Sequence, residues 1–258
     1  MHEFVTRVES RFRFSKKEAF HLFIIALVAS FGITIKDPWH FSDLIGGSGI
    51  TPYIINLIII TAIMFISFLI HFSVQKFMAL KLGYVAEYKI WINGLLIGLI
   101  LCVFSEGWVP LFLTGALLYD VVPKLRIGTF RGGVKHKDLG LISFAGPFSN
   151  LFIVGILALL HFIVNTPFVK SIIVINLLIA IYSLIPIPTF EKLRQFSGGT
   201  TGLYLFIASR WTFALVFVTV VSYSILVLIF HVFSYVLALV IGVATAIIYY
   251  SQFEMKKN

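Results

Sequence analysis

The chain has 258 residues, of which 59% are hydrophobic and 12% are charged. Soluble domains carry about 25% charged residues, so this composition excludes a water-soluble fold. The net charge is +9. A basic cytoplasmic face beside anionic lipid accounts for this charge, so no nucleic-acid partner is expected. Cys102 is the single cysteine, which excludes a disulfide framework and a thiolate metal site. We therefore expect an all-α polytopic membrane protein with the lipid bilayer as a partner.

Three units are expected along the chain. Residues 1–18 form a basic amphipathic segment, in which Arg11 and Arg13 lie among phenylalanines, as in helices at a membrane surface. Residues 19–205 form the membrane core, and residues 206–258 form C-terminal transmembrane helices.

Stretches of about 20 apolar residues predict the transmembrane helices. About six are expected, at residues 19–35, 53–75, 139–162, 170–187, 211–230 and 232–250.

The segment after the second span is irregular. Residues 95–119 are apolar but are interrupted by Ser105-Glu106-Gly107-Trp108. Each half has about 10 to 12 residues, too few to span a bilayer. We therefore expect a re-entrant hairpin that enters and leaves on one side, with Glu106 near its tip. The alternative is a single tilted span of about 25 residues, which would invert the topology of everything after it.

The basic residues predict the orientation, because cytoplasmic loops retain positive charge. With both termini and segments 76–89, 120–138 and 191–210 in the cytoplasm, 18 of the 20 basic residues are cytoplasmic. Only Lys36 and Lys170 then lie outside. The expected localisation is that of an integral, multi-pass cell membrane protein with both termini cytoplasmic.

A polar motif, His71-Phe72-Ser73-Val74-Gln75, lies near the end of the second span. Residues at i and i+4 share one face of a helix, and His-Glu-x-x-His in that setting binds zinc while its glutamate acts as the base. Here phenylalanine stands at the base position and glutamine at the second ligand position.

Two further motifs follow the first one in the chain. They are Ala145-Gly146-Pro147-Phe148-Ser149-Asn150 and Ser183-Leu184-Ile185-Pro186-Ile187-Pro188-Thr189-Phe190-Glu191. In order and spacing, the three motifs resemble the site-2 protease family (peptidase family M50) of intramembrane zinc metalloproteases, in its compact prokaryotic subgroup. The resemblance implies a site-2 protease-like core, with an extended segment after Gly83.

The resemblance also implies a degenerate metal site. His71, Gln75 and Glu191 would occupy the ligand positions, and Phe72 the position of the base. A phenyl ring cannot take a proton from zinc-bound water, and glutamine lacks the affinity of imidazole for zinc. No cofactor is therefore expected, the alternative being zinc bound by His71 and Glu191.

The positions that shape the family's groove are better kept. The groove and substrate-positioning residues implied by the resemblance are Asn150, Gly146, Pro147, Ser183, Pro186 and Pro188. Gly146 permits close helix approach, and Pro147 frees a backbone carbonyl. Ser183 replaces an asparagine thought to position substrate in the family, and Thr189 replaces a proline.

These patterns give three hypotheses. The leading one is a pseudoprotease that binds a transmembrane or membrane-proximal segment of a partner or former substrate without cutting it. The first alternative is an atypical intramembrane zinc metallopeptidase that uses His71, Gln75 and Glu191. The second is a transporter or channel component built around Glu106 and Asp120, since acids at membrane depth are often functional.

Overall fold

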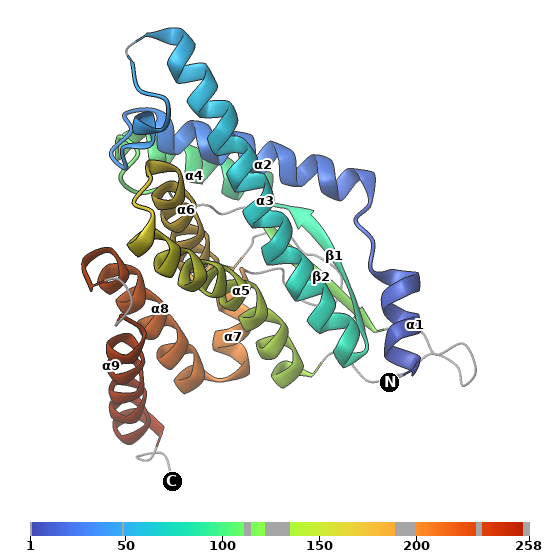
Figure 1. The fold of residues 1–258 in the computed structure, drawn as a ribbon. Coiled ribbons are helices and arrows are strands. Elements are labelled where there is room, and N and C mark those ends of the chain that lie inside the picture. The colour runs from blue at the N-terminus through green and yellow to red at the C-terminus, as the bar shows by residue number, and fades with distance from the viewer. Residues whose placement is uncertain are drawn as a thin grey trace.

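The structure is a computed structural model that describes residues 2–47, 49–110, 115–121, 135–188, 200–230 and 234–254. Within these residues it is a helix bundle with one small sheet (Figure 1). The helices are α1 (His2–Arg11), α2 (Lys16–Thr34), α3 (Ile50–Leu82), α4 (Ile92–Phe104), α5 (His136–Ile163), α6 (Pro167–Ser183), α7 (Thr201–Ala208), α8 (Arg210–Phe230) and α9 (Ser234–Tyr249). A short 3-10 helix, η1 (Phe41–Leu44), follows α2, and a π-helical turn (Tyr250–Glu254) follows α9.

Five of these helices, α2, α3, α5, α8 and α9, are long and apolar enough to cross a membrane. This confirms the expected multi-pass membrane protein. Helix α6, which covers most of the expected span at residues 170–187, is apolar but has 17 residues and is shorter than these five. A helix of that length rises about 25 Å, somewhat less than a typical hydrocarbon core. It packs against α3 and α5, and the sixth span stays a prediction.

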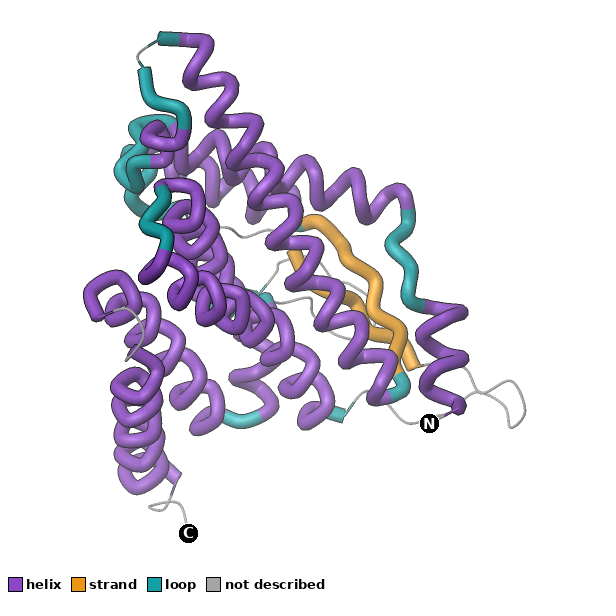
Figure 2. Tube along the Cα trace, viewed as in Figure 1, coloured by secondary structure: helices purple, strands orange, loops and turns teal. Residues whose placement is uncertain are grey.

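A two-stranded antiparallel sheet interrupts the otherwise all-α architecture (Figure 2). Strand β1 (Tyr84–Ile90) pairs with β2 (Gly115–Val121), with Tyr84 opposite Val121 and Ile90 opposite Gly115. Gly83 ends α3 in a left-handed conformation with φ of 90°, which glycine adopts without steric cost. The chain thereby turns from α3 directly into the extended segment β1.

The segment between the strands returns to the end of the bundle from which it starts. The pairing of β1 with β2 brings the two ends of residues 84–121 together, which excludes the alternative of one tilted span. The hairpin is deeper than expected, however. The Tyr88 N–H donates to Glu18 near the start of α2 (2.7 Å). Glu106, at the tip, pairs with Lys36 beyond the end of α2 (2.6 Å).

Residues 88–106 therefore run the whole length of α2, about 28 Å for 19 helical residues. Helix α4 has only 13 residues, too few to span a bilayer alone, and β1 lengthens the entering arm at about 3.3 Å per residue. The length of an apolar run predicts a span only if the whole run is helical, so it could not predict an arm made of a strand followed by a helix.

The N-terminal half of the bundle is joined by a buried ion pair. Lys76 Nζ on α3 lies 2.6 Å from Glu18 Oε1 on α2, and the two side chains are only 5% and 4% exposed. Lys76 also donates to the Arg13 carbonyl (3.1 Å) and lies over the Phe14 ring. Glu18 completes a capping box with Ser15 at the start of α2. Three elements, α2, α3 and β1, thus meet at one carboxylate.

The ends of the described chain lie together. Figure 1 shows the start of α1 and the end of the C-terminal helical segment at the same end of the bundle as the turn from α3 to β1. The opposite end holds the loops that follow α2, α4 and α5. The predicted boundary between residues 205 and 206 falls inside α7. Which end faces the cytoplasm stays a prediction.

The buried ion pair predicts a large stability effect. Lys76→Met leaves the Glu18 carboxylate buried without its cation, which typically costs about 3–5 kcal/mol. The matched control is Lys36→Met, which breaks a pair whose side chains are 60% and 58% exposed and should cost about 0–1 kcal/mol. Unfolding in detergent, followed by circular dichroism, measures both. Equal effects of the two variants would contradict the assigned role of Lys76.

The hairpin geometry predicts a labelling pattern. In a Cys102→Ala background, cysteines at Glu106 and Lys36 should react with a membrane-impermeant thiol reagent from the same side of the membrane. A cysteine at Lys81, near the end of α3, should react only from the other side. Labelling of positions 81 and 106 from one side would exclude a hairpin that runs the length of α2.

Candidate functional site

Two polar side chains, His71 and Gln75, lie one turn apart on α3 and face α5. Both are buried, with 1% and 0% of their surface exposed. Gly146 of α5 makes this approach possible: an added β-carbon there would lie 2.5 Å from His71 Nε2 and 2.6 Å from Gln75 Nε2. Only glycine fits at these distances, so Gly146 fixes the separation of α3 and α5.

Pro147 supplies the polar contact between the same two helices. Proline has no N–H and cannot bond to the carbonyl four residues earlier, which here belongs to Ser143. The Ser143 carbonyl instead accepts a hydrogen bond from Gln75 Nε2 (3.4 Å). Gly146 thus gives His71 and Gln75 space, and Pro147 frees the carbonyl that Gln75 bonds.

Asn150 completes the polar contacts of His71. It is fully buried one turn beyond Gly146 on α5, and its side chain lies near the His71 ring. Ser149 lies beside it and donates to the Gly146 carbonyl (2.7 Å). The structure therefore brings together His71, Gln75, Gly146 and Asn150, four of the predicted site residues.

Four buried polar atoms in this cluster have no hydrogen-bond partner among the described residues. They are His71 Nδ1, Gln75 Oε1, Ser143 Oγ and Asn150 Nδ2. An unsatisfied buried donor or acceptor costs about 1–3 kcal/mol, so such a group usually meets a water, an ion or a ligand. The cluster offers both donors and acceptors, as a backbone peptide group or a water molecule requires.

Phe72, at the position of the base, is part of an aromatic cluster. Its ring centroid lies 4.5 Å from that of Tyr88 on β1 and 6.3 Å from that of Phe68. Phe72 is 4% exposed and Tyr88 is 2% exposed. Among the described residues, the space around Phe72 beside His71 is thus filled by aromatic hydrocarbon.

A small cavity of about 20 Å³ lies beside His71 and Phe72. Its other walls include Gly115 at the start of β2, Ser183 at the end of α6, and Thr200. This volume holds about one water molecule. Ser183 therefore lines the same cavity as His71, although its hydroxyl donates to the Ala180 carbonyl (2.9 Å).

The segment after Ser183 is held by Thr200. The Ile187 N–H donates to Thr200 Oγ1, and the Thr200 N–H donates to the Ile187 carbonyl, both at 3.0 Å. Pro186 and Pro188 flank this contact and are exposed. They stiffen the segment but do not line the cavity. No local signal in the sequence points to Thr200, because no spacing rule links it to residue 187.

The metal site cannot be completed from the described residues. Among them, no group of three His, Cys, Asp or Glu side chains is placed to hold a metal ion. Glu191 and Thr189 lie outside the described residues, so the predicted closeness of His71 and Glu191 is not tested. One imidazole and one carboxamide do not fit zinc, which takes three or four strong ligands in proteins.

The two other predicted acids lie elsewhere. Glu106 is at the tip of the hairpin, 58% exposed and paired with Lys36. The backbone of Asp120 pairs with Val85 in the sheet, and its side chain is outside the described part of the structure. The ion pair with Lys36 accounts for Glu106 without an ion path.

Comparison with protein-family models, with curated proteins and with solved structures gave no match.

The close approach at Gly146 gives a prediction. Gly146→Ala should destabilise the protein by about 1–3 kcal/mol, as overpacking does, because the new methyl displaces His71 and Gln75. Gln75→Ala in the same chain removes one clashing group, so the double variant should cost less than the sum of the two changes. Phe148→Ala on the exposed face of α5 is the control. Additive effects in detergent unfolding would show that Gln75 does not meet residue 146.

Proposed function

We propose that the protein is a catalytically inactive relative of the site-2 proteases that binds a membrane segment of a partner protein without cutting it. The motif residues that shape packing, Gly146, Pro147 and Asn150, all contact the His71 cluster. Those that would carry out hydrolysis have changed. A packed helix contact beside a site that lacks a base supports a binding role.

The single observation that carries this proposal is the position of Phe72. The base is the group that activates water in zinc peptidases, and its loss typically removes about 10² to 10⁴ of rate. Here the substitution is integrated into the core, since Phe72 packs on Tyr88 and Phe68. A carboxylate in this cluster would be desolvated, so the surrounding residues also suit an aromatic ring and not a base.

An extended partner segment has a structural place in this proposal. Strand β2 pairs with β1 along one edge, and its other edge has no strand neighbour among the described residues. Gly115, the first residue of β2, lines the same cavity as His71. A segment that added to β2 by backbone hydrogen bonds would end beside the unpartnered polar atoms of the cluster. Binding needs this cavity to widen, because it now holds about one water.

The two alternatives find less support. A zinc peptidase would need a second strong ligand in place of Gln75, whose amide nitrogen already bonds the Ser143 carbonyl. It would also need a base in place of Phe72. A transporter would need acids along a path, whereas Glu106 is exposed at one end of the bundle.

The proposed orientation follows from the lysines and arginines. The turn from α3 to β1 and both ends of the described chain would be cytoplasmic, with Lys36 and Lys170 on the other side. The His71 cluster would then lie in the cytoplasmic part of the membrane, within little more than a helical turn of Lys76.

The experiment uses the full chain in nanodiscs with a fluorescent transmembrane peptide that contains helix-breaking residues. A photo-crosslinking residue at Leu118 of β2 should capture this peptide, while one at the exposed Leu159 of α5 should not. A uniformly helical polyleucine peptide is the control for nonspecific insertion. We expect capture without cleavage. Stoichiometric zinc together with cleavage, both lost in His71→Ala, would show that the protein is an active protease.

A rebuilt site gives a matched prediction. Phe72→Glu, Gln75→His and Glu191→Asp together restore two imidazoles, a carboxylate and a base, the set of an open catalytic zinc site. Zinc content, measured by atomic emission on purified protein, should rise toward one per chain. Phe72→Glu alone adds the base but not the second imidazole ligand, so this variant should not raise the zinc content. No zinc uptake by a folded triple variant would mean that residue 191 is not aligned with the family's third ligand.

A further inference from the structure

A second cavity lies at the opposite end of the bundle from the turn between α3 and β1. Its volume is about 210 Å³, and it lies between the loop after α2 and the start of α6. Trp39, His40 and Asp43 line one side, and Asn165 and Lys170 line the other. Such a volume accommodates several water molecules or a small polar group.

The cavity carries two opposite charges that do not meet. Neither Lys170 nor Asp43 forms an ion pair among the described residues. A second lysine among the described residues at this end, Lys36, pairs with Glu106 at 2.6 Å. Both side chains are exposed at this cavity, so a ligand that carries both charges can pair with them.

Hydrogen-bond donors gather on the side of Lys170. The N-cap residue of α6, Thr166, makes no side-chain capping bond, and Pro167 follows it. The first N–H groups of a helix attract anions when they lack such a cap. The Asn165 amide and the His40 ring add further donors at the cavity wall. An acidic group therefore fits beside Lys170, and an ammonium group fits beside Asp43.

The loop that carries His40 and Asp43 is held in an unusual conformation. Asp37 and His40 have φ of 46° and 58°, a left-handed region that costs non-glycine residues free energy. The Asp37 carboxylate accepts from the Phe41 N–H at 2.6 Å, and the Trp39 indole donates to the Gly107 carbonyl at 3.1 Å. The loop is thus pinned at both sides of His40, which preforms the cavity wall.

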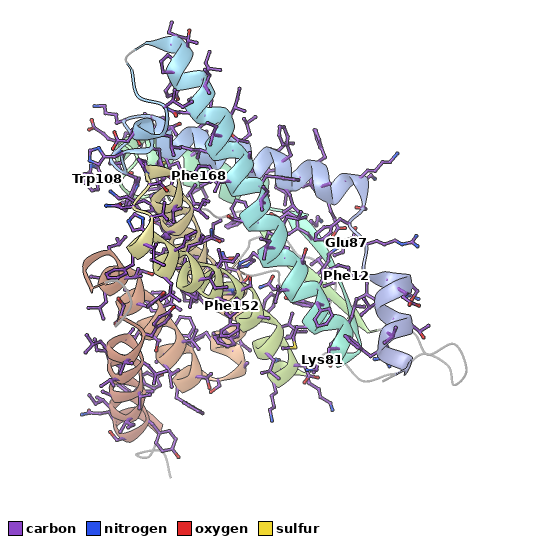
Figure 3. The ribbon with its side chains drawn as sticks, viewed as in Figure 1. Phe12, Lys81, Glu87, Trp108, Phe152 and Phe168 are labelled. Carbon is purple, nitrogen blue, oxygen red and sulfur yellow. The ribbon has the colours of Figure 1, made fainter. Side chains whose placement is uncertain are left out.

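The surroundings of the cavity are those of a membrane surface. The Trp39 and Trp108 rings lie 6.1 Å apart, and tryptophans concentrate at the level of lipid headgroups. Figure 3 shows Trp108 and Phe168 at this end of the bundle. Phe168, 50% exposed, and Ile45, 43% exposed, present hydrocarbon next to the cavity, where acyl chains would lie.

We infer that this cavity binds the headgroup of a phospholipid that carries a phosphate and a primary ammonium group, with the phosphate at Lys170 and the ammonium at Asp43. A primary ammonium donates hydrogen bonds to a carboxylate, whereas a trimethylated one cannot. An anionic headgroup without an amine would leave the Asp43 carboxylate unpaired beside a like charge. Phosphatidylethanolamine has the required chemistry.

The test is lipid binding by the full chain in detergent, measured by native mass spectrometry with phosphatidylethanolamine, phosphatidylcholine and phosphatidylglycerol of equal chain length. Phosphatidylethanolamine should bind about tenfold more tightly than the other two, a preference typical of charge-assisted hydrogen bonds. Lys170→Gln and Asp43→Asn should each remove this preference, and Lys170→Arg should keep it. Soluble glycerophosphoethanolamine in a separate titration distinguishes a free phosphate ester from a lipid.

The control is Lys36→Gln, which removes a lysine at the same end of the bundle without touching the cavity. It should leave the lipid preference within about twofold of the unaltered chain, since surface charges act weakly at a distance. Equal binding of the three lipids would overturn the inference, as would equal losses in Lys36→Gln and Lys170→Gln. Binding of the soluble ester as tight as that of the lipid would overturn the membrane origin of the ligand.

Discussion

The carboxylate of Glu18 is the point on which the arrangement of the N-terminal half depends. It accepts hydrogen bonds from Lys76 on α3, from the Tyr88 N–H on β1 and from the Ser15 N–H before α2. Two charges removed from water are costly unless such partners surround them, so the three elements can meet in only a few ways. Because β1 is held there, Tyr88 is placed against Phe72. The candidate site thus inherits its shape from an ion pair about one helical turn away.

The second constraint is the contact between α3 and α5. Gly146 removes a side chain where His71 and Gln75 need space, and Pro147 leaves the Ser143 carbonyl free for Gln75. The glycine leaves space for the two side chains, and the proline leaves a carbonyl free to accept a hydrogen bond. The two neighbouring residues therefore act together in the contact between α3 and α5. This explains how the motif can serve a bundle without hydrolysis. The polar atoms left unpaired at its centre are what a bound group would satisfy.

The sequence predicted most of the helices because apolar runs of span length are a strong signal. Residues 71 and 75 share a face, and the roles of Gly146 and Pro147 follow from their chemistry. An extended segment after Gly83 was expected, but its pairing with β2 was not, because β1 alternates buried and exposed residues over only seven positions. The contacts of Lys76 with Glu18, and of Thr200 with residue 187, join distant segments. No local period encodes such pairs, although Ser15-x-x-Glu18 is a recognisable capping box.

Helix α6 links the two cavities of the molecule. Its first turn carries Lys170 at one cavity, and its last turn carries Ser183 at the other. The helix between them is largely buried and packs on α3 and α5, and close-packed interiors transmit strain. A shift of α6 that widened the His71 cavity would therefore also displace the wall that carries Lys170. Binding of a partner segment at one end and of a headgroup at the other would act on the same element, which is the physical requirement for coupling between them.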